Sequence, residues 1–244
     1  MGFVDLSEKT ILVTGASSGI GRSLSVVAAS VGAKLVLNGR SEERLEETRL
    51  MLAGEGHVCI AGDLGDRCVV ATIAKTKMAL NGFVHCAGIS KPVPLRLASD
   101  AAVDQTFNTN LMSMIFLLRD LLKGNRLEIG ASIIFVGSVA SVTGTQGTVL
   151  YSSSKAALMG AVRPLAVELS RKKMRVNSVA PAVVKTEIWT TEQEAWLEKQ
   201  AANYPLGLGE AIDVANAIAF FLSDASAYMT GSELVLDGGC TFVE

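Results

Sequence analysis

Histidine and cysteine are scarce in this chain of 244 residues, which holds two histidines and four cysteines. The cysteines, Cys59, Cys68, Cys86 and Cys240, form no C-x-x-C pair and have no Cys/His spacing typical of a zinc site. We therefore expect no metal. We interpret the cysteines as free thiols, packed as small apolar groups in a reducing compartment.

Long hydrophobic runs and an excess of positive charge are also missing. No apolar run approaches the roughly 18 uncharged residues that a membrane span needs, and the N-terminus lacks the charged and apolar regions of a signal peptide. The formal net charge of −2 offers no basic surface for nucleic acid. We expect a cytoplasmic protein that binds neither membrane nor nucleic acid. Its 49% hydrophobic and 19% charged residues exclude disorder.

A glycine-rich turn follows the first apolar run, in Thr14-Gly-Ala-Ser-Ser-Gly-Ile-Gly21. Glycine lets the backbone turn tightly and lets a pyrophosphate approach the amides, while the start of the following helix favours an anion. The spacing is G-x-x-x-G-x-G and differs from the usual dinucleotide fingerprint. The alternative is an ordinary turn before a helix. We predict a nucleotide phosphate site formed by Gly15, Ser17, Ser18, Gly19 and Ile20.

Apolar runs of strand length alternate with helical segments along the rest of the chain. After the strand before the glycine loop, strands are predicted at 34–37, 58–61, 82–88, 132–136, 175–179 and 233–236. Helices are predicted at 23–31, 42–53, from 66, at 106–123, 151–171 and 213–222. This alternation predicts an α/β fold: one Rossmann-type, doubly wound parallel sheet of about seven strands with helices on both faces. No linker or repeat divides residues 1–244 into two domains.

The residues after the second predicted strand, Asn38-Gly-Arg40, bear on the cofactor. An acidic residue at this point would bind the ribose 2′-hydroxyl of NAD, and none is present. Arg40 is placed to pair with a 2′-phosphate, which favours NADP(H); the alternative is a solvated arginine. Asp63 and Leu64 follow the third strand and are placed to contact the adenine, although Asp also begins turns.

Tyr151 and Lys155 are four residues apart in a predicted helix, so their side chains project from one face. A nearby ammonium lowers the pKa of a tyrosine from about 10, which makes Tyr151 a candidate general acid or base. Such a pair is usually part of a solvated helix face. Ser138 ends the preceding strand, where the strand ends of an open α/β sheet form the ligand crevice, and this favours the catalytic interpretation.

In order and spacing, these motifs resemble the short-chain dehydrogenase/reductases. The resemblance covers the glycine loop, Ala87-Gly88, Asn110, Ser138, Tyr151-x-x-x-Lys155, Pro181 and residues 230–239. In particular, the chain is similar to the bacterial 3-oxoacyl-[acyl-carrier-protein] reductases. It implies an NADPH-dependent enzyme, a homotetramer, and cofactor contacts from Ala87, Gly88, Tyr151, Lys155, Pro181, Val184 and Thr186.

The resemblance also implies a role for each catalytic residue. Tyr151 would protonate the carbonyl oxygen of the substrate, and Ser138 would hydrogen-bond the same oxygen. Lys155 would lower the pKa of Tyr151 and hold the nicotinamide ribose. Asn110 would anchor a water that connects Lys155 to solvent.

The chain departs from the family pattern at three places. His85-Cys-Ala-Gly88 stands where Asn-Asn-Ala-Gly is usual, and we interpret His85 as a neutral residue at a strand end, with an acid or base as the alternative. Pro164 lies inside the catalytic helix and predicts a kink two turns beyond Lys155. Ala182 replaces the glycine that usually follows Pro181.

The substrate is expected to be bound under a lid at 188–208, a segment with Trp189, Trp196 and Tyr204 whose apolar residues suit an acyl chain. We expect reduction of a 3-oxoacyl thioester. One alternative is a reaction on a sugar, polyol or other small alcohol or ketone, and another is a non-catalytic sensor that binds NADP. Basic residues near the pocket are candidates for docking acyl carrier protein, the alternative being a solvated helix end: Arg171, Lys172, Lys173 and Arg175. Ile129 occupies the other basic docking position.

Overall fold

The computed structural model describes residues 3–76, 78–186, 194–202 and 204–242. Its centre is a seven-stranded sheet in the order β3-β2-β1-β4-β5-β6-β9, in which every pairing is parallel. The strands are β1 (Thr10–Thr14), β2 (Lys34–Gly39), β3 (Val58–Ala61), β4 (Leu80–His85), β5 (Leu127–Val136), β6 (Arg175–Pro181) and β9 (Glu233–Leu236). The predicted Rossmann-type parallel sheet is therefore confirmed.

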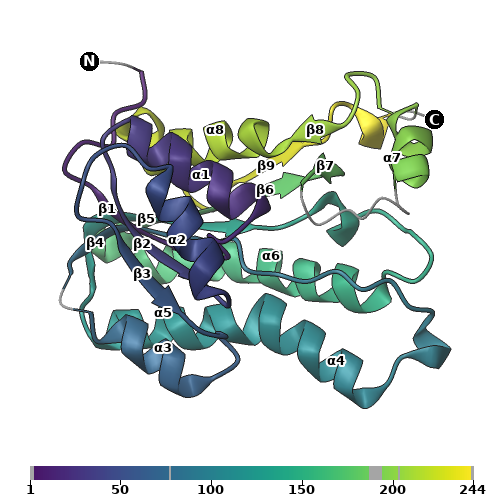
Figure 1. Ribbon diagram of the computed structural model, residues 1–244, viewed down its shortest axis with the longest axis horizontal. Helices are drawn as coiled ribbons and strands as arrows, with labels where there is room; N and C mark the ends of the chain where they lie inside the picture. The colour runs from purple at the N-terminus through teal and green to yellow at the C-terminus, as the bar shows by residue number, and fades with distance from the viewer. Residues whose placement is uncertain (1–2, 77, 187–193, 203, 243–244) are drawn as a thin grey trace.

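Helices cover both faces of this sheet (Figure 1). On one face lie α1 (Gly19–Ser30), α2 (Glu42–Leu50) and α8 (Ala211–Leu222), and on the other lie α3 (Arg67–Ala74), α5 (Ser113–Lys123) and α6 (Val149–Leu169). Successive residues of a strand point to opposite faces. Ile11 and Val13 therefore join the first core and Leu12 joins the second. Burial on both faces explains why the strands read as nearly continuous apolar runs.

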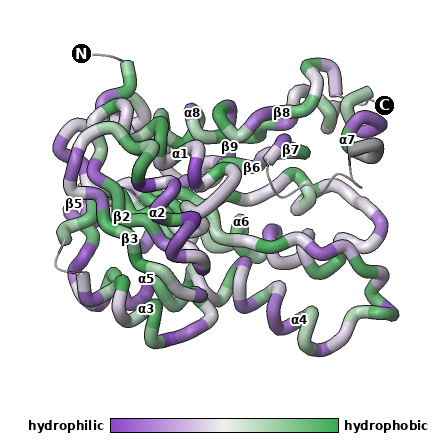
Figure 2. Tube along the Cα trace, in the orientation of Figure 1, coloured by the Kyte–Doolittle hydropathy of each residue, from purple (hydrophilic) through white to green (hydrophobic). Residues whose placement is uncertain are grey.

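Two helix starts follow directly from capping residues. The Ser41 side chain accepts a hydrogen bond from the Arg44 amide at the start of α2, and Asp66 accepts one from the Cys68 amide at the start of α3. Both starts agree with the sequence prediction. Helix α2 is largely hydrophilic along its length (Figure 2), because it buries few of its side chains, among them Leu45 and Thr48.

The helix predicted over 106–123 is longer and irregular. It begins with α4 (Asp100–Phe107), passes through a π-helical turn (Asn108–Met112) and continues as α5. Helix α6 continues through Pro164 to Leu169, so the proline does not end it. The continuation through Pro164 agrees with the helix predicted over 151–171. Hydrophobic spacing does not indicate the π-helical turn, because such a turn differs from an α-helical one by a single residue.

The predicted lid is described only in part. Helix α7 (Glu194–Ala201) falls within it, and two short strands that flank the region, β7 (Val184–Lys185) and β8 (Gly209–Glu210), pair with each other. Trp189 and the side chain of Trp196 lie outside the described residues. Tyr204 is described, and its hydroxyl oxygen accepts a hydrogen bond from the Val183 amide at 3.2 Å.

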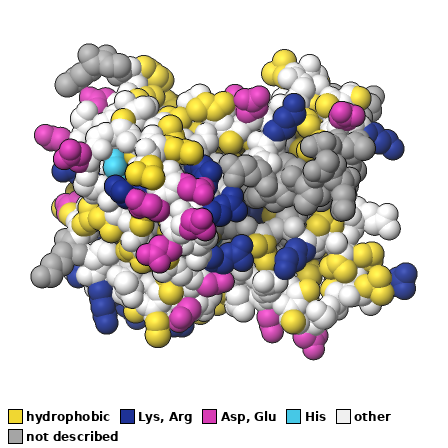
Figure 3. All heavy atoms as spheres, in the orientation of Figure 1, with side chains coloured by type: hydrophobic (Ala, Val, Ile, Leu, Met, Phe, Trp, Pro, Cys, Tyr) yellow, Lys and Arg dark blue, Asp and Glu magenta, His cyan; other side chains and the backbone are white. Residues whose placement is uncertain are grey.

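The surface mixes charges of both signs. Asp and Glu side chains are interspersed with Lys and Arg on the face that Figure 3 shows. Within the described ranges, no helix is long and apolar enough to cross a membrane. Those same residues contain no group of three or more His, Cys, Asp or Glu side chains that could hold a metal ion.

Arg175, expected among the docking residues, is instead a buried structural residue with 8% of its surface exposed. Its guanidinium donates to the backbone oxygens of Phe221 (2.8 Å), Ser223 (3.2 Å) and Ser226 (3.1 Å), and to Ser226 Oγ at 3.0 Å. These groups lie at the end of α8 and just after it, where carbonyls lack partners within the helix. Arg175, the first residue of β6, thus joins the start of this strand to the end of α8. The expectation that Arg175 docks a partner is wrong.

Replacing Arg175 with methionine should lower the free energy of unfolding by about 3 kcal/mol, because several buried carbonyl groups lose a charged donor. Urea unfolding followed by circular dichroism measures the change. Arg171→Met is the matched control, since Arg171 is exposed, and it should stay within about 0.5 kcal/mol of the wild type. Equal stability of the two variants would contradict the structural role of Arg175.

Candidate active site

The predicted site residues gather at the carboxyl ends of the central strands. β1 ends at Thr14 before the glycine loop, β4 ends at His85 before Ala87, β5 ends just before Ser138, and β6 ends at Pro181. In open α/β sheets this edge is where ligands bind. The fold therefore brings together motifs that are more than 100 residues apart in the sequence.

The glycine loop requires its glycines. Gly15 has a φ of +68°, and a Cβ there would lie 2.9 Å from the Ala87 amide nitrogen, so the loop packs directly on the end of β4. Ser18, at the N-terminal cap of α1, makes no side-chain capping bond. The first amides of α1 are thus left for another acceptor. A Cβ on Gly19 would lie 3.4 Å from the Thr186 methyl carbon, which places Thr186 beside the loop.

The other end of the predicted cofactor site lies after β2 and β3. The Asn38 side chain is buried and donates to the Ile60 and Gly62 carbonyls at 2.9 and 3.3 Å, which ties the two strand ends together. Arg40 follows β2 and is exposed. The Asp63 carboxylate accepts from the Gly65 amide at 2.8 Å, so it does form a turn, and Leu64 beside it is buried. These positions leave Arg40 accessible to an anion.

Ser138, Tyr151 and Lys155 form a compact group. Ser138 follows β5 and is 7% exposed, Tyr151 lies in the first turn of α6, and a side-chain hydrogen bond joins the two residues. Lys155 is 4% exposed, and its Nζ donates to the Val136 carbonyl at 2.7 Å. The same Nζ lies 5.8 Å from the centroid of the Tyr151 ring. The predicted grouping of these three residues is therefore present in the structure.

Burial sets the proton affinities of this group. It raises the pKa of Tyr151 above its usual value, and the hydrogen bond with Ser138 offsets part of that rise. Burial also lowers the pKa of Lys155 to about 8. The prediction that Lys155 lowers the pKa of Tyr151 does not hold in this structure, because Nζ is held by the Val136 carbonyl. Ser138 is the neighbour that favours the phenolate.

Asn110 is fully buried in the π-helical turn. Its amide nitrogen donates to the Ile89 carbonyl at 3.0 Å and to Ser154 Oγ at 2.9 Å, and its oxygen accepts from the Ile89 amide at 2.7 Å. A Cβ on Gly88 would lie 3.3 Å from Lys155 Nζ and 3.4 Å from Asn110 Oδ1. Asn110 therefore clamps the segment after β4 onto α6 beside Lys155. A π-helical turn is often found at functional sites.

Sequence reasoning missed two polar residues that complete the site. Thr14 Oγ1 accepts from the Ala87 amide at 3.2 Å, and Ser154 Oγ donates to the Tyr151 carbonyl at 2.7 Å. Thr14 could have been found, because it is the last residue of the strand that carries the glycine loop. Nothing distinguishes Ser154 from its neighbours in the run Ser152-Ser-Ser154.

Of the two departures after Phe83, His85 is buried and Cys86 is half-buried, and both are uncharged. Burial, with a smaller contribution from the Lys155 charge, lowers the pKa of His85 to about 3, which agrees with the interpretation of a neutral residue. Burial raises the pKa of Cys86 to about 12, so its thiol stays protonated. Neither side chain is an acid or base near neutral pH.

The basic residues Arg171, Lys172 and Lys173 are exposed but lie far from this group within one subunit. They follow the end of α6, whereas Tyr151 is at its start. At 1.5 Å per residue, the twenty intervening steps correspond to about 30 Å. The expectation that they lie near the pocket is therefore wrong for a single chain.

Comparison with known proteins places this site in a family. A family model described as enoyl-(acyl carrier protein) reductase matches residues 15–241. A solved short-chain dehydrogenase/reductase family protein is 33% identical, with a TM-score of 0.87, and the match covers 97% of this chain and 99% of that one. The chain is a short-chain dehydrogenase/reductase. It is thus an oxidoreductase that acts on CH–OH groups with a nicotinamide cofactor.

Curated relatives of the family match over nearly their whole length. Carbonyl reductase family member 4 of Danio rerio is 35% identical, covering 95% of this chain and 98% of the relative. The 3-oxoacyl-[acyl-carrier-protein] reductase of Homo sapiens is 34% identical, covering 97% and 99%. The FabG protein of Rickettsia felis, which carries the same reductase name, is 30% identical, covering 98% and 100%.

The buried His85 predicts a loss of stability in mild acid. The unfolded chain takes up a proton below pH 6.5, whereas the folded chain does so only near pH 3, so the free energy of unfolding falls as the pH drops through this window. Between pH 7 and pH 5 the loss due to His85 is about 2 kcal/mol. Urea unfolding at both pH values should show this extra loss in the wild type relative to His85→Asn. Identical pH dependence would contradict the burial of a neutral imidazole.

Proposed function

We propose that this short-chain dehydrogenase/reductase is an NADPH-dependent reductase of a ketone carbonyl, with a 3-oxoacyl thioester as its substrate. The observation that carries the proposal is the group of buried Ser138, buried Lys155 and half-buried Tyr151, with Lys155 beside Gly88. The names of the relatives, carbonyl reductase and 3-oxoacyl-[acyl-carrier-protein] reductase, support carbonyl reduction in both cases.

The residues present fit a nicotinamide dinucleotide. A loop with no room for a Cβ at Gly15 and with a positive φ at Gly19, and a helix start without a side-chain cap, form the cradle that a pyrophosphate needs. We assign the phosphates to Gly15, Ser17, Ser18, Gly19 and Ile20, the 2′-phosphate to Arg40, and the adenine to Asp63 and Leu64. The nicotinamide half is assigned to Ala87, Gly88, Tyr151, Lys155, Pro181, Val184 and Thr186.

When bound, NADPH supplies the hydride that reduces the carbonyl carbon. The chain itself handles the oxygen. Ser138 Oγ accepts from the Ala140 amide at 3.2 Å, which leaves its hydroxyl proton to donate to the carbonyl oxygen. Tyr151 gives its proton to the same oxygen, and its raised pKa keeps the phenol protonated at neutral pH, as an acid must be. Lys155 then returns a proton to Tyr151, with Asn110 beside it.

The basic residues on the surface bear on whether the acyl group is carried by acyl carrier protein or by a small thiol. Arg175 is buried, and the exposed basic residues Arg171 to Lys173 lie at the opposite end of α6 from Tyr151. Ile129 is 77% exposed where carrier-protein reductases place a basic residue. A single subunit therefore offers few basic residues near its site to an acidic carrier protein. Acyl carrier protein is one candidate carrier of the acyl group, and a small acyl thioester is the other. Residues 188–208 remain our prediction for the lid.

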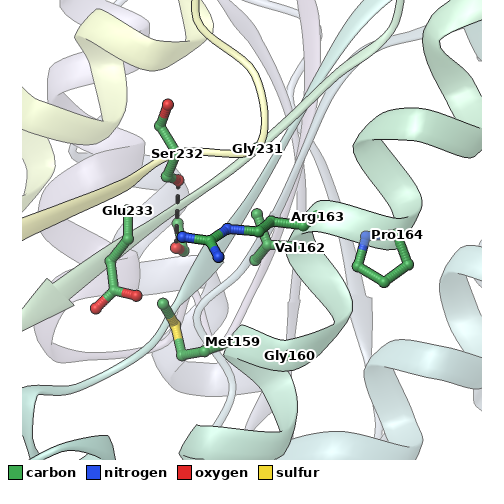
Figure 4. Close-up of a pocket in the computed structure, with 9 residues that line it drawn as sticks. Met159, Gly160, Val162, Arg163, Pro164, Gly231, Ser232 and Glu233 are labelled. Carbon is green, nitrogen blue, oxygen red and sulfur yellow. Dashed lines mark hydrogen bonds between the residues drawn. The ribbon is translucent and has the colours of Figure 1, made fainter.

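We also propose a homotetramer, as the family resemblance implies. The sheet ends at β9, and within the described chain one edge of this strand has no partner. Beside it, a cavity of about 430 Å³ lies between α6 and β9, and Figure 4 shows Arg163 extending across it toward Ser232 and Glu233. Val167 and Val235 are 76% and 44% exposed. An open strand edge with exposed apolar residues is a surface that another chain can cover.

Oxidation of NADPH, followed at the nicotinamide absorbance, tests the function with acetoacetyl thioesters and a panel of sugars and simple ketones. We expect turnover of the thioester, and Tyr151→Phe should reduce the rate by at least about a hundredfold while NADPH still binds. Turnover of other carbonyls alone would assign the small-molecule alternative. Binding of NADPH without any turnover would favour the sensor, and an unaltered rate in Tyr151→Phe would contradict the mechanism.

Arg40 determines the cofactor preference in this proposal. Arg40→Ala should weaken the binding of NADPH at least about tenfold, because a charge-assisted contact with the 2′-phosphate is lost, and should leave NADH binding nearly unchanged. Dissociation constants measured by nicotinamide fluorescence provide the comparison. Arg44→Ala, on the exposed part of α2 in the same region, is a control for general charge effects. Equal weakening of both cofactors would refute the 2′-phosphate contact.

A further inference from the structure

Two carbonyl groups of the glycine loop are held by side chains of the neighbouring helices. The Arg22 guanidinium, near the start of α1, donates from Nη2 to the Ser17 carbonyl at 2.8 Å. The Thr48 hydroxyl of α2 donates to the Ala16 carbonyl at 3.0 Å. Arg22 Nε in turn donates to Thr48 Oγ1 at 3.1 Å, so the two side chains are joined. The proposed function gives neither of these side chains a role.

Thr48 is a completely buried polar residue of α2, a helix whose buried residues are Leu45 and Thr48. Its hydroxyl also lies 3.0 Å from the Arg44 carbonyl one turn earlier. That carbonyl has the Thr48 amide as its helical donor, so the hydroxyl proton serves the Ala16 carbonyl, which lies outside the helix. The Arg22 side chain is 14% exposed. Both polar groups are thus enclosed together with their partners in the loop.

Glu47 limits what the Arg22 charge can do. Its carboxylate lies 3.0 Å from Arg22 Nη2, and the Glu47 side chain is 51% exposed. The ion pair carries no net charge, so Arg22 adds little long-range attraction for an anion. The hydrogen bond from Arg22 to the Ser17 carbonyl is directional and does not depend on that net charge. Arg22 therefore acts mainly on the orientation of the loop.

The two held carbonyls fix the direction of the amides that follow them. In a planar trans peptide, as in this loop, the C=O of one residue and the N–H of the next point in opposite directions. The Ala16 carbonyl faces Thr48, so the Ser17 amide points away from that hydroxyl. The Ser17 carbonyl faces Arg22, so the Ser18 amide points away from the guanidinium. These are two of the amides to which we assign the pyrophosphate.

The loop is also held from the side of β2. The Ala16 amide donates to the Asn38 carbonyl at 2.9 Å, so both polar groups of the Ala16 backbone are bonded. A Cβ on Gly39 would lie 2.8 Å from Ser17 Oγ, which places Ser17 on the last residue of β2, just before Arg40. With bonds to β2 on one side and to α2 on the other, this part of the loop has one orientation.

We propose that Arg22 and Thr48 are positioning residues for the dinucleotide cofactor: by holding two loop carbonyls, they turn the amides that follow toward the pyrophosphate. The proposal rests on the proposed function, which assigns the phosphates to this loop. It concerns the part of the cofactor that NADPH and NADH share, whereas Arg40 is assigned to the 2′-phosphate alone. Variants of Arg22 and Arg40 therefore differ in which cofactors they weaken.

Dissociation constants measured by nicotinamide fluorescence test the role of Arg22. Arg22→Met should weaken NADPH and NADH by the same factor, at least about tenfold, because a charged donor to the loop is lost. ADP-ribose, which has the pyrophosphate without the nicotinamide, should lose the same factor in competition. Arg22→Lys keeps the charge without the planar fork, so it should bind both cofactors at least about threefold more weakly than the wild type.

Arg49→Met is the matched control for Arg22→Met. Arg49 lies on the same helix as Thr48 and pairs with Glu46, and both side chains of this pair are more than 40% exposed. The variant removes a charge and an ion pair from α2 and should bind both cofactors within about twofold of the wild type.

Thr48 provides a second test that removes no charge. Thr48→Val keeps the shape and loses the hydroxyl, so it should weaken both cofactors at least about threefold. Thr48→Ser keeps the hydroxyl and should stay within about twofold of the wild type. At saturating NADPH, kcat should stay within about threefold in Arg22→Met and Thr48→Val, because the catalytic group is unchanged. A residue that only stabilises the fold would not weaken the cofactor while leaving kcat in place.

The outcomes separate this proposal from the proposed function. Wild-type binding by Arg22→Met, full recovery in Arg22→Lys, or weakening of NADPH alone would overturn the positioning role and leave the reductase intact. Equal binding by Thr48→Val and Thr48→Ser would overturn the role of the hydroxyl. If the wild type binds both cofactors and reduces no carbonyl, the proposed function fails, and the dissociation constants still decide this proposal. A wild type that binds neither cofactor would overturn both. Thermal unfolding shows whether each variant is folded.

Discussion

The site depends on the parallel pairing of β1 with β4. This pairing sets Thr14 opposite His85, and the close packing of Gly15 on Ala87 follows from it, with 2.9 Å between the Ala87 nitrogen and the position of a Gly15 Cβ. The Thr14 hydroxyl then bonds to both the Ala87 amide and the His85 ring. A shift of register would separate the glycine loop from the strand end that must face it. The glycine loop and the segment after β4, whose Gly88 lies beside Lys155, are thus fixed by one strand pair.

Burial controls the proton affinities of the titratable residues near this strand pair. The pKa of Tyr151 rises while those of Lys155 and His85 fall, because each shift favours the uncharged form. The polar contacts that remain are to neutral partners: Val136 for Lys155, Ser138 for Tyr151 and Thr14 for His85. Of these three residues, it is Tyr151 that holds its proton more tightly for this reason. That property suits an acid in carbonyl reduction.

Much of the fold could be predicted, because a buried parallel strand is apolar on both faces and the helix between two strands has its own cap. Ser41 and Asp66 mark helix starts that the structure shows at the same residues. The site residues on strand ends and on one helix face could be placed for the same reason. The π-helical turn and the contacts of Asn110 could not, since they depend on how α4 and α5 meet α6 in space.

The errors have one physical cause, which is that charge on a side chain does not reveal where that side chain points. Arg175 follows Arg171, Lys172 and Lys173 in the sequence, and the four look like one basic cluster. Arg175, the first residue of β6, points toward the end of α8, where backbone carbonyl oxygens accept hydrogen bonds from its buried guanidinium. The other three stay in solvent at the end of the sheet opposite Tyr151. Recognition of the substrate that we propose, a 3-oxoacyl thioester, would therefore come in one subunit from the residues around the strand ends, without help from this cluster.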